Sequence, residues 1–446
     1  MDELSKFCND LKNIIKDSKE LTIEEARLVV KYINEFLYTN YPKIGTIDVL
    51  GRSFQYISDF HKYWEKHYEK ILNAEIDIRK CEQVADALHE IFLKTHGKAF
   101  YNIWDKQNLP DQDVCRIRLL TANQEFRGSR TFADFAKIFK DDHTIFDENK
   151  IFEDPGNFLK KIKILKLSQN DKRIKFAQKI AEFILNTGKT PYELISYFNN
   201  DVSKLREALI NCQGAGYGPK KTDMFLRDMV VLGIWKNVKG FEFIDVASDE
   251  NTMKVALRVG ILKTSIPLVS SFLDIFCHQY GYIAKKNADA WRVVWKEWKR
   301  KYPNECVLSP CLIDYFIYNV VGKQFCKEAL VIFKCKENDK HIFKWHSSRN
   351  KTCQICLNEG IKKKKADAID KVYPCKDPEG KIAILKSDFV SSLRDDEKFE
   401  NCPFKNICDS NGTKFLQPPK SISIEGETSW KTAYTSKDDG GGGLMA

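Results

Sequence analysis

Long apolar runs are missing from this 446-residue sequence. The longest ones, such as Val230–Trp235 and Ala329–Phe333, fall far short of the roughly 18 residues that a membrane-spanning helix needs. The first residues, Met1–Lys6, lack the basic start and the apolar stretch of a secretory signal. We therefore expect a protein that is not secreted and that does not insert into a membrane.

Glycine and proline are also scarce, at 22 and 13 residues. Apolar residues make up 43% of the chain and charged residues 30%, which is the composition of an ordinary globular protein and excludes collagen-like and low-complexity chains. At roughly 150 residues per domain, the length predicts about three domains. The net charge of +10 favours polyanionic partners, although the excess is spread over a long chain.

Most of the 14 cysteines are scattered, but five lie between Cys353 and Cys408. In a reducing compartment such a cluster indicates metal ligation before disulfide bonding. Two pairs stand out, Cys353 with Cys356 and Cys402 with Cys408, and they are separated by 45 residues that include Cys375. Four thiolates suit an iron–sulfur cluster or a tetrahedral Zn²⁺ ion, and thiols without a metal are the remaining alternative.

Helical patterns dominate from Leu21 to about Trp298. A helix is predicted to begin at Asn170 or Asp171 and to stop at Gly188, and Thr190 caps the next helix. The character changes after Pro303, where two short apolar runs within Cys326–Trp345 predict a β-hairpin.

The segment Gly214–Leu226 carries the most informative motif, a Gly-x-Gly turn that enters a helix. Such a turn leaves bare backbone N–H groups at the positive end of the helix, where a phosphate can approach without obstruction. A helix connection that needs glycine only for its positive φ angle would show the same pattern. The motif alone leaves both interpretations open.

An acidic residue, Asp249, follows Lys220 by 29 positions and stands at the start of a short amphipathic helix. Together the two segments resemble the helix-hairpin-helix DNA glycosylases, the superfamily of endonuclease III. Gly216–Lys220 matches the Gly-x-Gly-x-Lys of the hairpin. Asp249 aligns with the catalytic aspartate of the family, and Lys254 and Arg258 keep the register of the helix that follows. Asp249 also fits a simple helix N-cap.

The resemblance covers residues 106–270 and leaves the first 105 or so without a counterpart. It implies that Asn123 or Gln124 fills the gap left by an extruded base, although a helix terminus with solvated amides fits either residue equally well. The remaining residues that it implies contact DNA are Gly216, Gly218 and Lys221.

The implied fold is mainly α, a two-domain helical glycosylase core with an extra N-terminal helical region and a C-terminal metal module ligated by cysteine. The form Cys402-Pro-x-x-x-x-Cys408 resembles the end of the family's [4Fe–4S] loop, with Zn²⁺ as the alternative. The expected parts are an N-terminal helical region (1–105), a six-helix barrel domain with the hairpin (106–245), a second helical domain (246–350), the cysteine-rich module (351–420) and a tail (421–446).

The implied activity is excision of a modified or damaged base from double-stranded DNA by a monomeric enzyme, located at the nucleoid in the cytoplasm if the source is bacterial. Asp249 would be the catalytic carboxylate. Lys220 would either attack the sugar and add lyase activity or only contact phosphate. The sequence does not identify the base; a hypermodified cytosine of phage DNA, in defence rather than repair, is one candidate. A DNA-binding protein without catalysis and with a structural metal, or a protein acting on RNA, are the alternatives.

Overall fold

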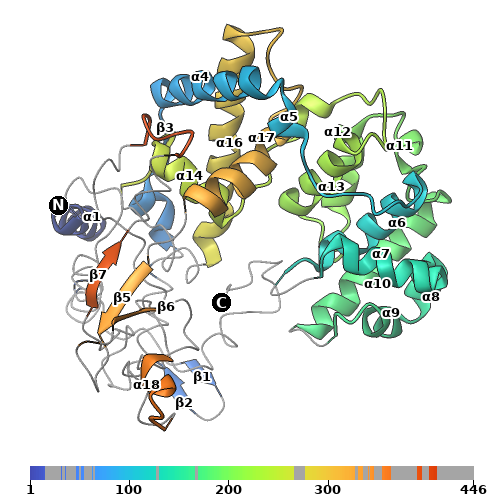
Figure 1. Ribbon diagram of the computed structural model, residues 1–446, viewed down its shortest axis with the longest axis horizontal. Coiled ribbons are helices and arrows are strands. Elements are labelled where there is room, and N and C mark those ends of the chain that lie inside the picture. Colours follow the sequence, from blue (N-terminus) through green and yellow to red (C-terminus); the bar gives the residue numbers. More distant parts are fainter. Residues whose placement is uncertain are drawn as a thin grey trace. The chain divides into compact units, whose positions relative to one another are not determined.

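The computed structural model describes most of the helical part of the chain (Figure 1). The described residues are 1–15, 32, 36, 47–49, 52–54, 63, 66–126, 130–165, 169–265, 277–326, 330–334, 340, 342–345, 354–362, 389–393 and 401–408. They are mainly helical, which confirms the predicted class at that level. The chain divides into two compact units, the first made of Met1–Val84, Met253–Ala290 and Val320–Met445, and the second of Ala85–Thr252 and Trp291–Asn319.

The second unit is built from helices joined by short turns. Its α-helices are α5 (Lys98–Tyr101), α6 (Asp111–Thr121), α7 (Phe132–Asp141), α8 (Glu148–Glu153), α9 (Pro155–Lys161), α10 (Asn170–Thr187), α11 (Leu194–Tyr197), α12 (Val202–Asn211), α13 (Pro219–Val231) and α17 (Cys311–Tyr315). Single 3-10 turns stand at η1 (Ala122–Gln124), η2 (His143–Phe146) and η3 (Phe241–Phe243).

The helix predicted from Asn170 or Asp171 to Gly188 is confirmed as α10. It ends because Gly188 takes a left-handed conformation, with φ at 62°, which glycine adopts without strain. The hydroxyl of Thr190 then donates a hydrogen bond to the side chain of Glu193 before α11 begins. The apolar face of α10 packs against α8 and α9, and these helices lie together in Figure 1.

Aliphatic side chains from several helices form the core of the second unit. Each fully buried Leu or Ile contributes about 1.5–3 kcal/mol through the area it removes from water. A core of this kind can also hold charged groups in fixed positions, and those on α6 and α13 are described with the candidate site. Its completely buried members include Leu119, Leu120, Ile180, Leu205 and Leu226.

The first unit contains strands as well as helices. Its elements are α1 (Glu3–Ile15), β1 (Ile47–Val49), β2 (Arg52–Phe54), β3 (Glu75–Ile76), β4 (Leu262–Lys263), β5 (Leu330–Lys334), β6 (Ile342–Trp345), α18 (Gln354–Asn358) and β7 (Phe389–Leu393). Four further elements, α4 (Ile78–Thr95), α14 (Glu250–Val259), α16 (Cys277–Lys301) and the π-helix η4 (Phe316–Phe325), have residues in both units.

The expectation of a wholly helical region over residues 1–105 is wrong in detail. β1 pairs with β2 in an antiparallel hairpin, with Ile47 opposite Phe54, and β3 pairs with β4. The segment Ile47–Phe54 is rich in β-branched and aromatic residues, and Gly51 stands between its two halves, which favours a tight hairpin over a helix.

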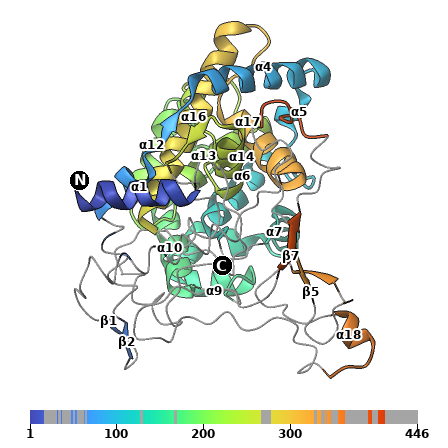
Figure 2. The same ribbon diagram turned by 90° about the vertical axis from the view of Figure 1, so that its left-hand side faces the viewer.

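The β-hairpin predicted within Cys326–Trp345 is confirmed. β5 pairs antiparallel with β6, and Phe333 lies opposite Phe343. β7 adds to the other edge of β5, and the two strands lie side by side in Figure 2. β7 falls among the 45 residues between the two cysteine pairs, where no strand was predicted.

The predicted domain limits differ from the two compact units. Residues 106–245, the expected barrel domain, all lie in the second unit, but that unit also contains 85–105, 246–252 and 291–319. The predicted limits assume parts that are continuous along the chain, whereas both units contain separate segments of it. Within the described part of the chain, no helix is both long and apolar enough to cross a membrane.

Candidate functional site

The Gly-x-Gly turn connects α12 to α13, as the sequence predicted. The chain leaves α12 at Cys212, and Gly214 and Gly216 take left-handed conformations with φ at 80° and 73°. Gly218 is the N-cap of α13, and Pro219 occupies the first turn of that helix, where its missing N–H is not needed. At Gly218 no side chain stands in front of the start of α13, and a Cβ atom there would meet nothing within 4 Å.

The glycines of the turn are needed for different reasons. A Cβ atom on Gly216 would come within 2.5 Å of the Phe176 ring, so the close approach of α10 requires glycine there in addition to the positive φ. Gly218 has φ at −83°, which any residue adopts, and a Cβ atom there would meet nothing within 4 Å. Gly216 thus serves packing, whereas Gly218 keeps the space in front of the helix end open.

Buried hydrogen bonds hold the turn in place. The hydroxyl of Tyr217 donates to the carbonyl of Leu119 at 2.5 Å. The side-chain amide of Asn123 donates to the carbonyl of Ala215 at 2.9 Å and to that of Phe176 at 3.2 Å. The turn is therefore fixed to α6, η1 and α10 before any ligand binds.

Asn123 and Gln124, the two candidates for the residue that fills a base gap, are both buried in the described structure. The Gln124 amide donates to the carbonyl of Arg173 at 3.2 Å, and the Arg173 guanidinium donates back to the carbonyl of Gln124 at 2.7 Å. In this conformation both amides support the turn. Neither shows the solvated helix terminus that was the alternative, and insertion into DNA stays a prediction.

Asp249 lies beside the hairpin. Its carboxylate oxygen Oδ2 is 4.0 Å from Nζ of Lys220, and the two side chains are 12% and 38% exposed. The other oxygen, Oδ1, accepts the backbone N–H of Thr252 at 2.9 Å, while the Thr252 hydroxyl accepts the N–H of Asp249 at 2.9 Å. Asp249 is therefore both the cap of α14 and the acidic partner of the hairpin lysine.

A network of paired charges, most of them buried, lies within electrostatic reach of Asp249 and Lys220. Arg118 on α6 donates to Asp228 at 2.9 Å and contacts Glu125. Asp228 also accepts from Arg227 at 2.6 Å, and Arg227 reaches Asp314 on α17. Further contacts join this network (Arg118, Glu125, Arg227, Asp228 and Asp314) to Trp104, whose indole N–H donates to Asp228 at 3.2 Å, and to Lys221, which is 3.4 Å from Glu125.

The pKa shifts differ between the two ends of this network, Lys221 and Asp314. Burial lowers the pKa of Lys221 to about 8. The positive charges of Lys220 and Arg118 lower this pKa further, whereas the negative charge of Glu125 raises it. Burial also raises the pKa of Asp314 to about 7, against the pull of Arg227 and with help from the carboxylate of Asp249. Asp314 is thus a second carboxyl group within electrostatic reach of the Asp249–Lys220 pair, and it is partly protonated near neutral pH.

The network was missed in the sequence, although a signal exists. Arg118 stands in the run Val114–Leu120 and the Arg227–Asp228 pair in the run Phe225–Val230, so each charge is flanked by apolar residues at core positions. Charges are rarely buried unless they are paired. Charged residues inside apolar helical runs therefore indicate such a network, but not which partners meet.

The predicted metal ligands are only partly described. Cys353 lies outside the described residues, Cys356 and Cys408 are buried, and Cys402 is half-buried. Over the described ranges, no three Cys, His, Asp or Glu side chains are grouped closely enough to hold a metal ion. The three described thiols thus do not form a [4Fe–4S] or Zn²⁺ site by themselves, and the metal module stays a prediction.

Comparisons with known proteins do not extend the motif-based resemblance. No family model, curated protein or solved structure matches this chain. The function therefore has to be argued from the site itself.

Proposed function

We propose that the protein is a DNA N-glycosylase that flips a modified base out of double-stranded DNA and cleaves its bond to the sugar. The observation that carries the proposal is the 4.0 Å approach of Asp249 to Lys220 at the mouth of the glycine turn. A helix end suited to an anion and a carboxylate beside it are groups that base removal can use, and the amine of Lys220 adds the possibility of strand scission.

Asp249 is suited to stabilise the transition state. Cleavage of an N-glycosidic bond develops positive charge on the sugar, and a fixed carboxylate close to C1′ stabilises that charge. The capping bonds with Thr252 hold the carboxylate in one orientation without reorganisation during the reaction. Water directed by Asp249 adds to C1′, and the bonding electrons leave with the base, which takes up a proton.

The turn at Gly216–Gly218 is suited to grip a phosphate next to the flipped nucleotide. The N–H groups at the start of α13 carry the positive end of the helix dipole. The open space at Gly218 lets the phosphate approach the backbone. Lys221 is 16% exposed and paired with Glu125, so it adds positive potential rather than a direct contact.

Lys220 is suited to a second step. Its amine can attack C1′ only as the free base, and the Asp249 carboxylate at 4.0 Å is a suitable acceptor for the proton that must leave. Attack by the amine instead of water displaces the base from C1′, and cleavage of the C1′–O4′ bond, with a proton taken up by O4′, then gives a Schiff base that permits strand scission. A Lys220 that contacts only phosphate would leave the enzyme with base removal alone.

A non-catalytic DNA-binding protein is the second candidate, because the capping bonds to Thr252 give Asp249 a structural role. Substitution of Asp249 by Asn distinguishes the two. Asn caps a helix as well as Asp does, so Asp249→Asn retains the fold and removes only the negative charge.

The proposal is tested by incubating the protein with a panel of DNAs that carry oxidised, alkylated, mismatched and hypermodified bases, including glucosylated phage cytosine. Released bases are identified by mass spectrometry. We expect wild type to release at least one base and Asp249→Asn to release it at least 100-fold more slowly, the scale of a lost electrostatic contact. Equal release by both proteins excludes Asp249 as the catalytic group, and no release of any base contradicts the proposal.

Lyase activity is tested separately with borohydride, which traps a Schiff base as a covalent protein–DNA adduct. If Lys220 is the nucleophile, wild type and Lys221→Gln form the adduct and Lys220→Gln does not. An adduct that persists in Lys220→Gln assigns the amine elsewhere. No adduct with wild type, together with base release, restricts the enzyme to hydrolysis.

A further inference from the structure

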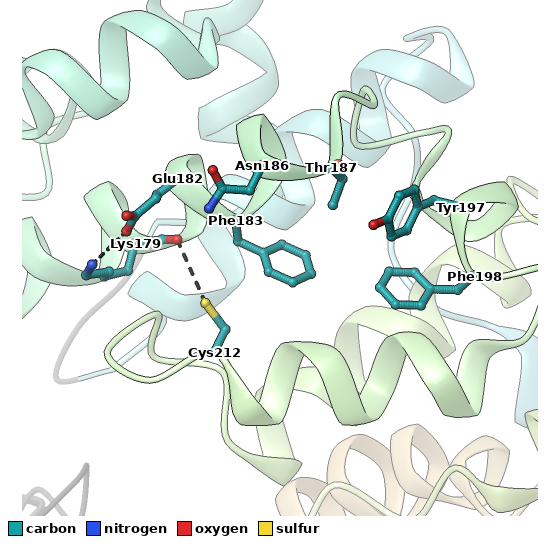
Figure 3. A pocket seen from close by; sticks show the side chains of 8 residues that line it. All are labelled: Lys179, Glu182, Phe183, Asn186, Thr187, Tyr197, Phe198 and Cys212. Carbon is teal, nitrogen blue, oxygen red and sulfur yellow. Dashed lines mark hydrogen bonds and ion pairs between the residues drawn. The ribbon is translucent and has the colours of Figure 1, made fainter.

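A cavity lies in the second unit, and Asp249 is not among the residues that line it. It has a volume of about 340 Å³ and is bounded by α10, by the end of α11 and by Cys212 at the end of α12 (Figure 3). This volume is in the range of small-molecule sites. No residue of the proposed catalytic site contributes to it.

Three aromatic rings surround the cavity. Phe183 projects from α10 toward Tyr197 and Phe198, whose ring centroids are 5.1 Å apart at an angle of 76° (Figure 3). Tyr197 is 51% exposed, so much of its ring faces water. Aromatic surface left in water is costly, and rings around an open cavity are typical of sites that accept a planar ligand.

Polar groups complete the rim. Lys179 and Glu182 form an ion pair at 2.6 Å, and the exposed side chain of Asn186 stands one turn further along α10. An amide and a carboxylate beside aromatic rings can accept and donate hydrogen bonds at the edge of a nucleobase. The cavity thus combines stacking surface with edge recognition.

The cavity is connected to the hairpin by α10. Lys175 covers Gly214, where an added Cβ atom would lie 2.7 Å from its Cε atom, and the Cys212 thiol is 3.9 Å from the carbonyl of Lys179. From Lys175 to Phe183 is eight residues of helix, about 12 Å. That is the length of about four stacked nucleotides. Lys175 lies along this path and supplies positive charge for a phosphate, whereas the charge of Lys179 is offset by its ion pair with Glu182.

We propose that, where the DNA strand held at the hairpin continues into an unpaired stretch, this cavity binds one nucleobase of that stretch, a few nucleotides from the base that is excised. The inference rests on the proposed function for its DNA partner, but the cavity itself is a separate binding site. A base stacks among Phe183, Tyr197 and Phe198, and the strand follows Lys175 and Lys179. Because every base has a flat face, this site tolerates different sequences.

Photo-crosslinking tests the inference directly. The probe is a duplex with an abasic-site analogue and a single-stranded extension in which one 5-iodouracil stands about four nucleotides from the analogue. After irradiation of the full chain, the crosslinked peptide is identified by mass spectrometry. We expect the crosslink on Tyr197, Phe198 or Phe183. Crosslinks confined to other peptides, or none, overturn the inference.

Binding measurements use variants on the rim. Tyr197→Ala is expected to weaken binding of the extended duplex by about tenfold, the effect of one lost stacking contact. Its binding of a blunt duplex stays unchanged. Tyr192→Ala is the matched control, because Tyr192 is also an exposed tyrosine, at 39%, but does not line the cavity. Equal affinity of Tyr197→Ala and wild type for the extended duplex contradicts the site.

The two proposals fail in different ways. Base release by wild type without a crosslink to the cavity removes the second site and keeps the glycosylase. A crosslink to the cavity without release of any base keeps the second site and removes the enzyme. A chain that binds neither duplex overturns both.

Discussion

The first turn of α13 separates two regions with opposite properties. On one side, Lys220 is 38% exposed and approaches Asp249 at 4.0 Å. On the other side, Lys221 is 16% exposed and joins a network in which the Arg118 and Asp228 side chains are 5% and 0% exposed. Two adjacent lysines thus belong to an open pair and to a closed network.

The difference indicates that the two regions have different roles, one in chemistry and one in folding. In the open pair the Lys220 side chain is partly exposed, while Thr252 holds the Asp249 carboxylate in a fixed orientation, which suits groups that act on a substrate. The closed network is fixed by several charge-assisted hydrogen bonds, and removal of a charged member leaves a buried charge with fewer partners. Substitutions on the closed side should therefore change folding, and those on the open side should change chemistry.

The largest effect on folding is expected for Arg118→Met. It removes the cation that Glu125 and Asp228 share and leaves Glu125 only Lys221, and Asp228 only Arg227, as cationic partner, which we expect to cost about 3 kcal/mol. Urea unfolding measures the loss. The control is Arg300→Met, which removes an exposed pair with Glu297 and should change stability by no more than about 0.5 kcal/mol. Equal effects of the two substitutions contradict the closed character of the network.

A smaller effect is expected within the turn itself. Gly216→Ala forces a side chain into a positive φ angle and against the Phe176 ring, and we expect a loss of about 1–3 kcal/mol. Gly218→Ala meets no atom and has an ordinary φ, so its stability should stay close to that of wild type. Its DNA affinity should fall, because the methyl group occupies the space of the phosphate. Equal unfolding free energies of Gly216→Ala and Gly218→Ala would refute the assignment of packing to Gly216 and of open space to Gly218.

The pH dependence of stability is expected to reveal the buried end of the network. The folded-state pKa of Asp314 is about 7, above its usual value of 3.8, so the folded protein binds this proton more tightly. Stability contributed in this way is complete at low pH and is lost as the pH rises toward 7, by at most about 1.4 kcal/mol per pH unit.

Asp314→Asn tests this effect, because Asn does not titrate. Its unfolding free energy should vary less than that of wild type between about pH 4 and 7. The groups around Asp314, namely Arg227, Asp228, Asp249 and Lys220, are the same in both proteins. Parallel pH profiles of the two proteins argue against a raised pKa at Asp314.

Local patterns in the sequence predicted much of the region around the hairpin. The limits of α10 and the turn into α13 follow from glycine positions and capping residues, whereas the nearness of Asp249 to the hairpin was implied by the resemblance to the glycosylase family. The charge network could not be predicted, because burial of Arg118 and Asp228 depends on which helices meet. β1, β2 and β7 were missed since short strands depend on their partners more than on their own pattern.

The central claim is that the Asp249 carboxylate serves chemistry and not only the start of α14. The most direct measurement is the single-turnover rate of base release by Asp249→Asn and by wild type, together with their urea unfolding curves. We predict unfolding free energies within about 0.5 kcal/mol of each other, because Asn retains the cap, and a rate at least 100-fold lower for the variant. Equal rates, or a rate that falls only in proportion to unfolding, would contradict the account.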